Sequence, residues 1–435
     1  MDGLFAAYEA SYLAFPGEPV LDDARALAVE RLRELQVPSF VGHGRRERRQ
    51  LPLHWRPPRL QAMWSLQRFC DDGDCRLVDP SVLQLSKVDF NLTQAVHREE
   101  LVQITKWWTD SGLSKKLPFA RDRLVECFFC AVCIAPEPHL GACREVISKV
   151  CVLVIHLDDI YDVYGVLDEL EAFTDAIGRW ARESVFVPVA EALPEYMKEM
   201  LSIIFTTSAT AAGGVLKEQG YDVLPLYKKA WHDLCKAFLV EAQWQKLGFK
   251  PSFKEYLSNG WVSSSGPLML LHALPTVTQQ QYPIMEMLLS SCGSDDVGTL
   301  PLIDYPRLIQ LSSRMFRLCN DMASHKAESE RSEATSSIDC CMAEMRATEE
   351  EARGVVEDAI AQTWKELNME VVVTVSAGIS SPWSTESMKM ASLCLNLART
   401  SCCVYQGGDG ITSPADGMDQ LVKALLFDPI PMALS

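Results

Sequence analysis

Three aspartates that follow an apolar segment are candidate metal ligands. Asp158, Asp159 and Asp162 end a stretch from Leu140 onward whose apolar positions cover most of a helix circumference, which predicts a buried helix. Residues four apart on a helix lie on one face about 6 Å from each other, so Asp158 and Asp162 should point together. Two ionised carboxylates in an apolar setting need a cation, and Mg²⁺ takes one or two protein carboxylates plus water and phosphate oxygens. The alternative, a solvated acidic helix end, suits Asp158 poorly because the preceding turns are apolar.

A second group of oxygen-bearing side chains follows a helical pattern that starts near Ile309. Asn320, Ser324 and Glu328 stand at positions i, i+4 and i+8, so they project from one side. They span about 12 Å along a helix axis, so one ion contacts all three only if the side chains converge. A capping or surface hydrogen-bond ladder is the alternative, and it would be favoured for Asn or Ser taken singly. The pairing with Arg317 and with the aspartates favours metal binding.

Three arginines accompany these two groups. Arg317 lies one turn before Asn320 on the same face and offers a fork of donors for phosphate oxygens. Arg121 and Arg123 stand just before an apolar run that begins at Leu124. An isolated Arg-x-Arg element is a weak signal, but it gains weight beside two oxygen-rich groups in an acidic protein.

The segments that carry these residues are predicted to be helical. Apolar residues recur at three- and four-residue spacing through most of the chain, with Gly and Pro gathered at junctions such as Gly407 to Gly410. The sequence shows no internal repeat and no alternation of strand and helix patterns. The 435 residues, 48% of them apolar, therefore predict an all-α protein with one large unit and a smaller companion. We expect a boundary near residue 77, between residues 1–77 and residues 78–435.

The composition argues against several classes of partner. A net charge of −17 disfavours nucleic-acid backbones and anionic membrane surfaces, and the basic run Arg45 to Arg49 is interpreted as a solvated loop. No stretch approaches the roughly 20 uncharged apolar residues of a membrane span, the best candidate being Val150 to Leu157. The 15 cysteines accompany no secretory leader and are interpreted as reduced thiols of an intracellular protein.

Several motifs form one ordered set along the chain. The principal ones are Arg121 to Glu126, Asp158 to Gly165 and Asn320 to Glu328; the others are Leu53–Arg56, Trp261–Pro267, Ser336–Cys340 and Tyr405–Gly410. In this set the sequence resembles the plant class I terpene synthases over essentially its whole length. The three principal motifs are similar to the Arg-x-Arg element, the aspartate-rich motif and the second metal motif of that family. The resemblance implies an all-helical catalytic domain with a central pocket, preceded by part of a helical N-terminal domain that has no active site.

The resemblance also assigns roles to residues. Direct Mg²⁺ coordination falls to five of them: Asp158, Asp162, Asn320, Ser324 and Glu328. Asp159 would support these ligands, while Arg121 and Arg317 would hold the diphosphate with Arg123 nearby. The family usually binds three Mg²⁺ ions, or Mn²⁺ in their place.

Two further elements are expected to act on the carbocation that forms when diphosphate departs. Tyr405 and Asp409 are candidates for late proton handling, in a loop whose glycines would let it act as a lid. A break at Ser263 to Pro267 would interrupt a pocket helix and turn carbonyl groups toward the cation.

The function implied by the resemblance is ionisation of geranyl or farnesyl diphosphate to a monoterpene or sesquiterpene plus diphosphate. An acyclic alcohol such as linalool or nerolidol is the expected product. We expect a monomer in the cytoplasm, or in the plastid if a transit peptide is missing from an N-terminally truncated chain.

Two alternatives remain. A prenyl-chain elongating transferase shares helix-borne metal groups, but it would normally carry two aspartate-rich motifs. A catalytically impaired relative is the other, because Cys130 stands where many family members have Trp on the pocket wall. An iron–sulfur site at Cys127, Cys130 and Cys133 is disfavoured against simple packing, since no fourth ligand is evident. The spacing of the eight histidines likewise disfavours zinc.

Overall fold

The computed structural model describes residues 2–35, 51–71, 78–182, 193–292, 303–331, 335–379, 381–411 and 416–432, and for a few of them, Glu328 included, the backbone alone. These ranges contain helices and no strand, and a single bridge joins Gln406 and Gly408. The prediction of an all-α fold is confirmed. In chain order the helices are α1 (Asp2–Ser11), α2 (Pro19–Glu34), η2 (Leu53–Trp55), α4 (Pro58–Asp71), α5 (Pro80–Ser111), α6 (Leu113–Lys116), α7 (Leu124–Ile134), α8 (Gly141–Asp159), η4 (Ile160–Tyr164), α9 (Leu167–Arg182), α10 (Glu195–Gln219), α11 (Leu224–Leu247), α12 (Phe253–Ser263), α13 (Gly266–Ala273), η6 (Leu274–Thr276), α14 (Pro283–Ser290), α15 (Arg307–Arg331), α16 (Ser337–Met345), α17 (Glu349–Ile379), α18 (Ser384–Val404) and α19 (Asp416–Leu426).

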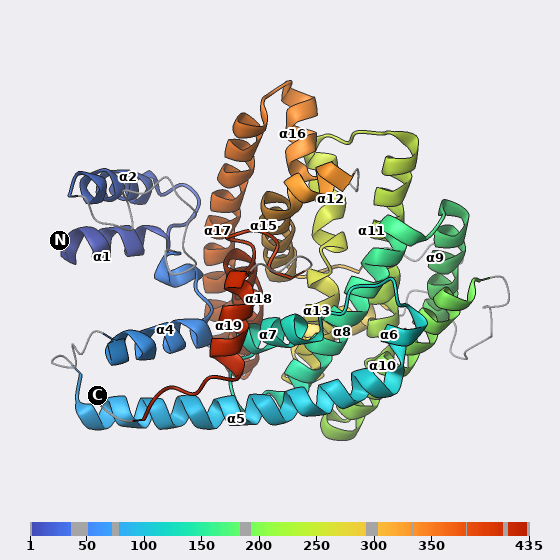
Figure 1. The fold of residues 1–435 in the computed structure, drawn as a ribbon, viewed down its shortest axis with the longest axis horizontal. Helices are drawn as coiled ribbons and strands as arrows, with labels where there is room; N and C mark the ends of the chain where they lie inside the picture. The colour runs from blue at the N-terminus through green and yellow to red at the C-terminus, as the bar shows by residue number, and fades with distance from the viewer. Residues whose placement is uncertain are drawn as a thin grey trace.

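The helices surround a central group that carries the candidate site. Helix α8 packs against α7 and α13, and α15 packs against α12, α13, α17 and α18. Figure 1 shows α1 and α2 at one end of the molecule, beyond α17, and the long α5 along one edge. The centre is therefore enclosed by helices from distant parts of the sequence.

Helix α8 is buried almost all round, as its apolar pattern predicts, and it ends at the aspartates. The chain then departs from the expected α-helix, because Ile160 to Tyr164 form one π-helical turn. The Gly165 N–H closes this turn by donating to the Ile160 carbonyl oxygen over 2.8 Å. A Cβ atom on Gly165 would lie 2.9 Å from the Ile160 carbonyl oxygen as well as 2.5 Å from the Leu170 side chain, so a larger residue would strain the turn.

Helices α12 and α13 are two parts of one interrupted helix. The break lies at Ser264 and Ser265, and Ser265 has a left-handed φ of 67°. Directly after it, Gly266 packs against α15 so closely that a Cβ would lie 2.5 Å from Ser313 Oγ and 3.0 Å from the Ser313 Cα. The predicted interruption of a pocket helix at this sequence is confirmed.

The N-terminal helices are attached to α17 by both aromatic and polar contacts. The rings of Trp55 and Trp364 stack with centroids 5.2 Å apart, and His54 Nε2 lies 2.7 Å from Asn368 Oδ1. Helix α4 also contacts α5 and α7. The predicted boundary near residue 77 and the basic run from Arg45 to Arg49 lie outside the described residues.

One described helix is long and apolar enough to span a membrane by length and composition, and the sequence interpretation did not single it out. This helix is α10, and 44% of its most apolar window is buried inside the protein. Because α10 packs against α8 and α11, its apolar residues contribute to the protein core.

The close approach at Gly266 makes a testable prediction. Replacement G266A should lower the free energy of unfolding by about 2 kcal/mol, because the added methyl overpacks the contact with the α15 backbone. The matched control is G354A, since Gly354 lies in α17 with no atom within 4 Å of an added Cβ. It should be neutral or stabilising by up to about 1 kcal/mol. Equal melting temperatures for the two variants would contradict this account of the break.

Candidate active site

A pocket opens beside the aspartate end of α8, the break between α12 and α13, the middle of α15 and the residues after α18. It covers about 560 Å³ of space, part of it open solvent, and is lined by Cys151, Val154, Ile155, Asp158, Phe238, Ser263, Ser264, Ser265, Phe316, Arg317, Asn320, Tyr405 and Ile411. Four of the residues predicted from sequence therefore meet in one place: Asp158, Arg317, Asn320 and Tyr405.

Arg121 is held against the end of α8. Its Nη2 atom lies 3.0 Å from Asp158 Oδ2 and 2.6 Å from Asp159 Oδ1, and its backbone N–H donates to Asp159 Oδ2 over 2.8 Å. The Asp159 side chain is only 7% exposed, whereas that of Asp158 is 36% exposed and lines the pocket. Asp159 thus fixes both the backbone and the side chain of Arg121, and Asp158 is the aspartate that a ligand in the pocket meets.

The charges of Arg121 and of the two aspartates beside it depend on one another. Burial raises the pKa of the Asp158 carboxyl to about 6, Asp159 adds to the rise, and Arg121 opposes it. Burial lowers the pKa of Arg121, but the charges of Asp158 and Asp159 outweigh burial and raise it above its ordinary value. One guanidinium faces two carboxyl groups, so ionisation of both leaves negative charge that favours a further cation.

Asp162 and Arg123 do not line the pocket. Asp162 belongs to the π-helical turn, so the predicted regular i, i+4 relation to Asp158 within one α-helix was wrong. Arg123 precedes α7 and donates from Nη1 to the backbone oxygen of Asp122 over 3.0 Å.

Tyr405 and Asp409 lie just after α18. The Tyr405 ring stacks on Phe316 with centroids 6.0 Å apart, and burial followed by the charge of Asp409 raises the pKa of Tyr405. Asp409 accepts a hydrogen bond from the Ile411 N–H over 3.0 Å, and its charge also contributes to the raised pKa of Arg121. Asp409 therefore acts electrostatically on the pocket from outside its lining.

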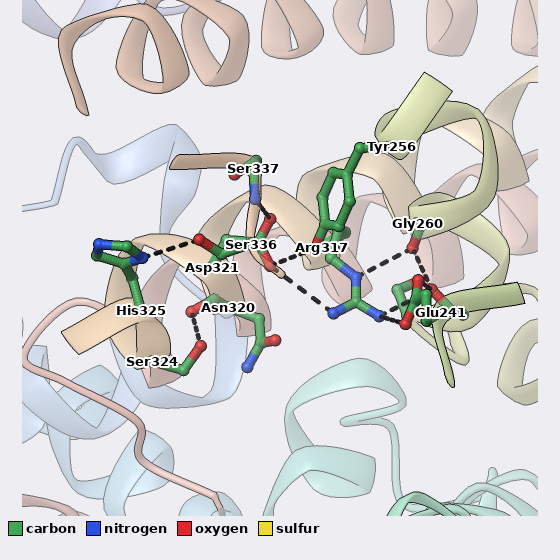
Figure 2. Close-up of polar contacts among 12 residues, drawn as sticks. Glu241, Tyr256, Gly260, Arg317, Asn320, Asp321, Ser324, His325, Ser336 and Ser337 are labelled. Atoms are coloured by element: carbon green, nitrogen blue, oxygen red, sulfur yellow. Dashed lines mark hydrogen bonds and ion pairs between the residues drawn. The ribbon is translucent and has the colours of Figure 1, made fainter. Parts of the chain in front are cut away.

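Arg317 reaches from α15 to the interrupted helix (Figure 2). Its Nε donates to the Gly260 carbonyl oxygen over 3.2 Å, and its Nη2 donates to Ser263 Oγ over 2.8 Å. Two carboxylates flank the guanidinium, with Glu241 Oε2 3.8 Å from Nη2 and Asp321 Oδ1 3.7 Å from Nη1. The side chain is 15% exposed, so one arginine at the pocket is fixed in position by four partners.

The two carboxylate partners of Arg317 have hydrogen-bond partners of their own, and sequence reasoning missed both carboxylates. Asp321 accepts hydrogen bonds from the Tyr256 hydroxyl and the Ser337 N–H, each over 3.0 Å (Figure 2). Burial raises the pKa of Asp321 and of Glu241, and Arg317 opposes both rises. The i, i+4 spacing of Arg317 and Asp321 was an available signal, whereas Glu241 lies on α11 and has no local signal.

The second predicted group of oxygen ligands lies on α15. Asn320 lines the pocket, and the buried Ser324 hydroxyl donates to the Asn320 backbone oxygen over 3.0 Å. That bond uses the hydroxyl hydrogen, and Ser324 itself does not line the pocket. Glu328 lies in α15, but its side chain is outside the described residues.

Oxygen donors of this kind fit Mg²⁺, since the carboxylate of Asp158 and the amide of Asn320 line the same pocket. Among the described residues, no three His, Cys, Asp or Glu side chains gather into a metal site. Amide, hydroxyl and substrate oxygens would therefore have to complete the coordination.

The rest of the pocket is largely apolar. Its lining includes Cys151 from α8, Phe238 from α11 and Phe316 from α15. Cys130 is buried in α7 and is not part of the lining. It is free, like Cys127 and Cys133, so the three cysteines pack within the core.

Comparison with known proteins identifies the family of this chain. Residues 109–366, more than half of the chain, match the model described as the terpene synthase family, metal binding domain. This chain belongs to the terpene synthase family. It is 38% identical to the chloroplastic isoprene synthase of Pueraria montana var. lobata, over 99% of this chain and 67% of that protein. It is 37% identical to the (−)-alpha-terpineol synthase of Vitis vinifera, over 99% of this chain and 68% of that protein.

A solved structure agrees with this assignment. The isoprene synthase from grey poplar leaves (Populus x canescens), in complex with three Mg²⁺ ions and dimethylallyl-S-thiolodiphosphate, is 37% identical and superposes with a TM-score of 0.83. The match covers 98% of this chain and 76% of that one. The family predicted from the motifs is confirmed, and the enzyme is a terpene synthase, a lyase that ionises a prenyl diphosphate.

The Arg317 network makes a second prediction. Replacement D321A should lower the free energy of unfolding by about 3 kcal/mol, because it leaves the Arg317 charge short of a partner and orphans the Ser337 N–H. The control S258A removes an exposed hydroxyl that bonds only within α12 and should change stability by less than about 0.5 kcal/mol. Chemical denaturation measures the free energy of unfolding of both variants. If D321A lost no more stability than S258A, the Arg317 network would not stabilise the fold.

Proposed function

We propose that this enzyme ionises a short prenyl diphosphate with the help of Mg²⁺ bound between Asp158 and Asn320. The observation that carries the proposal is that these two oxygen donors line one pocket together with Arg317, while Arg121 is bonded to Asp158. Positive and negative groups are thus arranged in advance around a space bounded by apolar walls. Such preorganisation is the usual source of catalysis when charge develops on a leaving group.

The predicted site residues take the following proposed roles. The metal ligands are Asp158, Asp162, Asn320, Ser324 and Glu328. Arg121 and Arg317 bind the diphosphate oxygens, with Arg123 nearby, and Asp159 holds Arg121 in place. Three bound Mg²⁺ ions, replaceable by Mn²⁺, would neutralise the charge of the departing diphosphate. The complex of the poplar enzyme with three such ions supports this number.

After the carbon–oxygen bond breaks, the walls act on the carbocation. Phe238, Phe316 and Tyr405 can stabilise it through their ring faces, and the apolar lining limits access of water. We assign late proton handling to Tyr405 together with Asp409, because the two are electrostatically coupled.

As the substrate we propose geranyl or farnesyl diphosphate, as the sequence interpretation has it; the likeness to an alpha-terpineol synthase supports this choice, whereas the poplar structure holds a dimethylallyl analogue. The acyclic alcohols linalool and nerolidol remain the products proposed for these two substrates. We further propose a monomer in which residues 1–77 form a helical part without catalytic residues and residues 78–435 form the catalytic domain. The chloroplastic name of the Pueraria enzyme supports a plastid location.

Removal of the Asp158 charge tests the metal site. Replacement D158N should lower diphosphate release from geranyl diphosphate by at least about 100-fold, because a preorganised charge at the leaving group is lost. The control D168N changes an exposed aspartate of α9 and should retain activity. Mass spectrometry of the products, with isopentenyl diphosphate added in a parallel assay, identifies the product. Near-normal D158N activity would contradict the metal role, and an elongated diphosphate would favour the transferase alternative.

Chelation tests the dependence on a divalent cation. Dialysis against excess EDTA should abolish diphosphate release, and Mg²⁺ or Mn²⁺ should restore it, whereas Ca²⁺ with its larger and looser coordination should restore little. Diphosphate is quantified in each state. Activity that survives exhaustive chelation would exclude the proposed metal requirement.

A further inference from the structure

Two cysteines from different helices meet beside the pocket. Cys319 on α15 and Cys402 on α18 have sulfur atoms 3.6 Å apart, and each residue is only 7% exposed. Their helices form one of the most extensive contacts of the fold. A disulfide requires an S–S distance of about 2.05 Å, so an approach of roughly 1.5 Å separates the two thiols from a bond.

A second cavity reaches these sulfurs from outside the active-site pocket. It covers about 1330 Å³ of space, part of it open solvent, between the N-terminal helices and α15, α17 and α18. Both Cys319 and Cys402 line it, together with Trp55 and Tyr405. A small oxidant can therefore approach the thiols without entering the substrate pocket.

We propose that Cys319 and Cys402 form a redox modification site, at which a peroxide converts the two thiols into one reversible disulfide that slows the enzyme. In the first step one thiol sulfur attacks hydrogen peroxide, giving a sulfenic acid and one water. In the second step the other thiol attacks that sulfur, the disulfide forms and a second water leaves. Two thiols and one peroxide thus give one disulfide and two waters. A dithiol reductant reverses the change by thiol exchange.

The position of the pair explains why the disulfide should slow turnover, and this step rests on the proposed function. Cys319 directly precedes Asn320, and Cys402 lies three residues before Tyr405, so each cysteine adjoins a residue of the substrate pocket. Drawing the sulfurs together displaces these two walls relative to each other. Because misplacement of reacting groups by about 1 Å can cost on the order of 100-fold in rate, we expect a loss of at least about tenfold.

The reaction should be slow. Cys319 and Cys402 are both only 7% exposed, which limits the access of peroxide to their sulfur atoms. Sustained exposure to peroxide is therefore required, rather than a brief pulse.

The full chain is incubated with hydrogen peroxide, the remaining thiols are alkylated, and the peptides are mapped by mass spectrometry. Diphosphate release is measured before oxidation, after it, and after dithiothreitol. The variant C402S removes one thiol with little change in size. The matched control C394S changes a buried cysteine on the same helix, which approaches Ser312 rather than another thiol.

The proposal predicts a Cys319–Cys402 linked peptide in the wild type and in C394S, with a loss of activity that dithiothreitol restores. C402S should keep its activity in peroxide and form no such peptide. Absence of the linked peptide after prolonged oxidation, or a linked peptide with unchanged turnover, would overturn the proposal. Peptide mapping detects the disulfide whether or not the enzyme is active. A reduced enzyme without activity would therefore count against the proposed function, while the peptide map would still decide whether the disulfide forms.

Discussion

The burial of the Arg317 charge is the constraint on which the arrangement of the pocket depends. A guanidinium with 15% exposure is stable only when carboxylates and hydrogen-bond acceptors surround it. Those partners come from three different elements: Glu241 from α11, Gly260 and Ser263 from α12, and Asp321 from α15 itself. Satisfying this one charge therefore fixes α15 against the interrupted helix. The pocket lies beside this contact, since Ser263 and Arg317 both line it.

On the opposite side of the pocket, buried carboxylates are in turn stabilised by an arginine. Asp158 and Asp159 end an apolar helix, and Arg121 compensates them from a segment that precedes α7. Asp159 is fully engaged, while Asp158 retains exposure to the pocket. The site thus holds its charges before any substrate arrives, so little rearrangement is needed when a diphosphate leaves. The packing of α15 against α18 also places Cys319 and Cys402 close in sequence to Asn320 and Tyr405, which is the basis of the proposed redox effect on turnover.

Sequence could predict what depends on local spacing. The helical class, the buried α8 and the break at Ser263 to Pro267 all follow from the pattern of residues along the chain, and the motifs indicated the family. The π-helical turn after Asp159 could not be predicted, because no residue pattern along the chain marks where the hydrogen bonds shift from i, i+4 to i, i+5 spacing. Glu241 could not be predicted either, since its role arises only when α11 and α15 meet in three dimensions. The spacing of Asp158 and Asp162 was read on the assumption of a regular helix, and that assumption failed at a single turn.

The central claim is that cations bind between the α8 and α15 walls of this pocket. The most direct measurement is anomalous diffraction from crystals of the full chain grown with Mn²⁺ and an unreactive prenyl thiolodiphosphate. The account predicts manganese peaks at ligand distances of roughly 2.0 to 2.3 Å from an Asp158 oxygen on one side and the Asn320 side-chain oxygen on the other. A pocket that binds the analogue with no manganese at either residue, or with manganese only elsewhere on the surface, would contradict it.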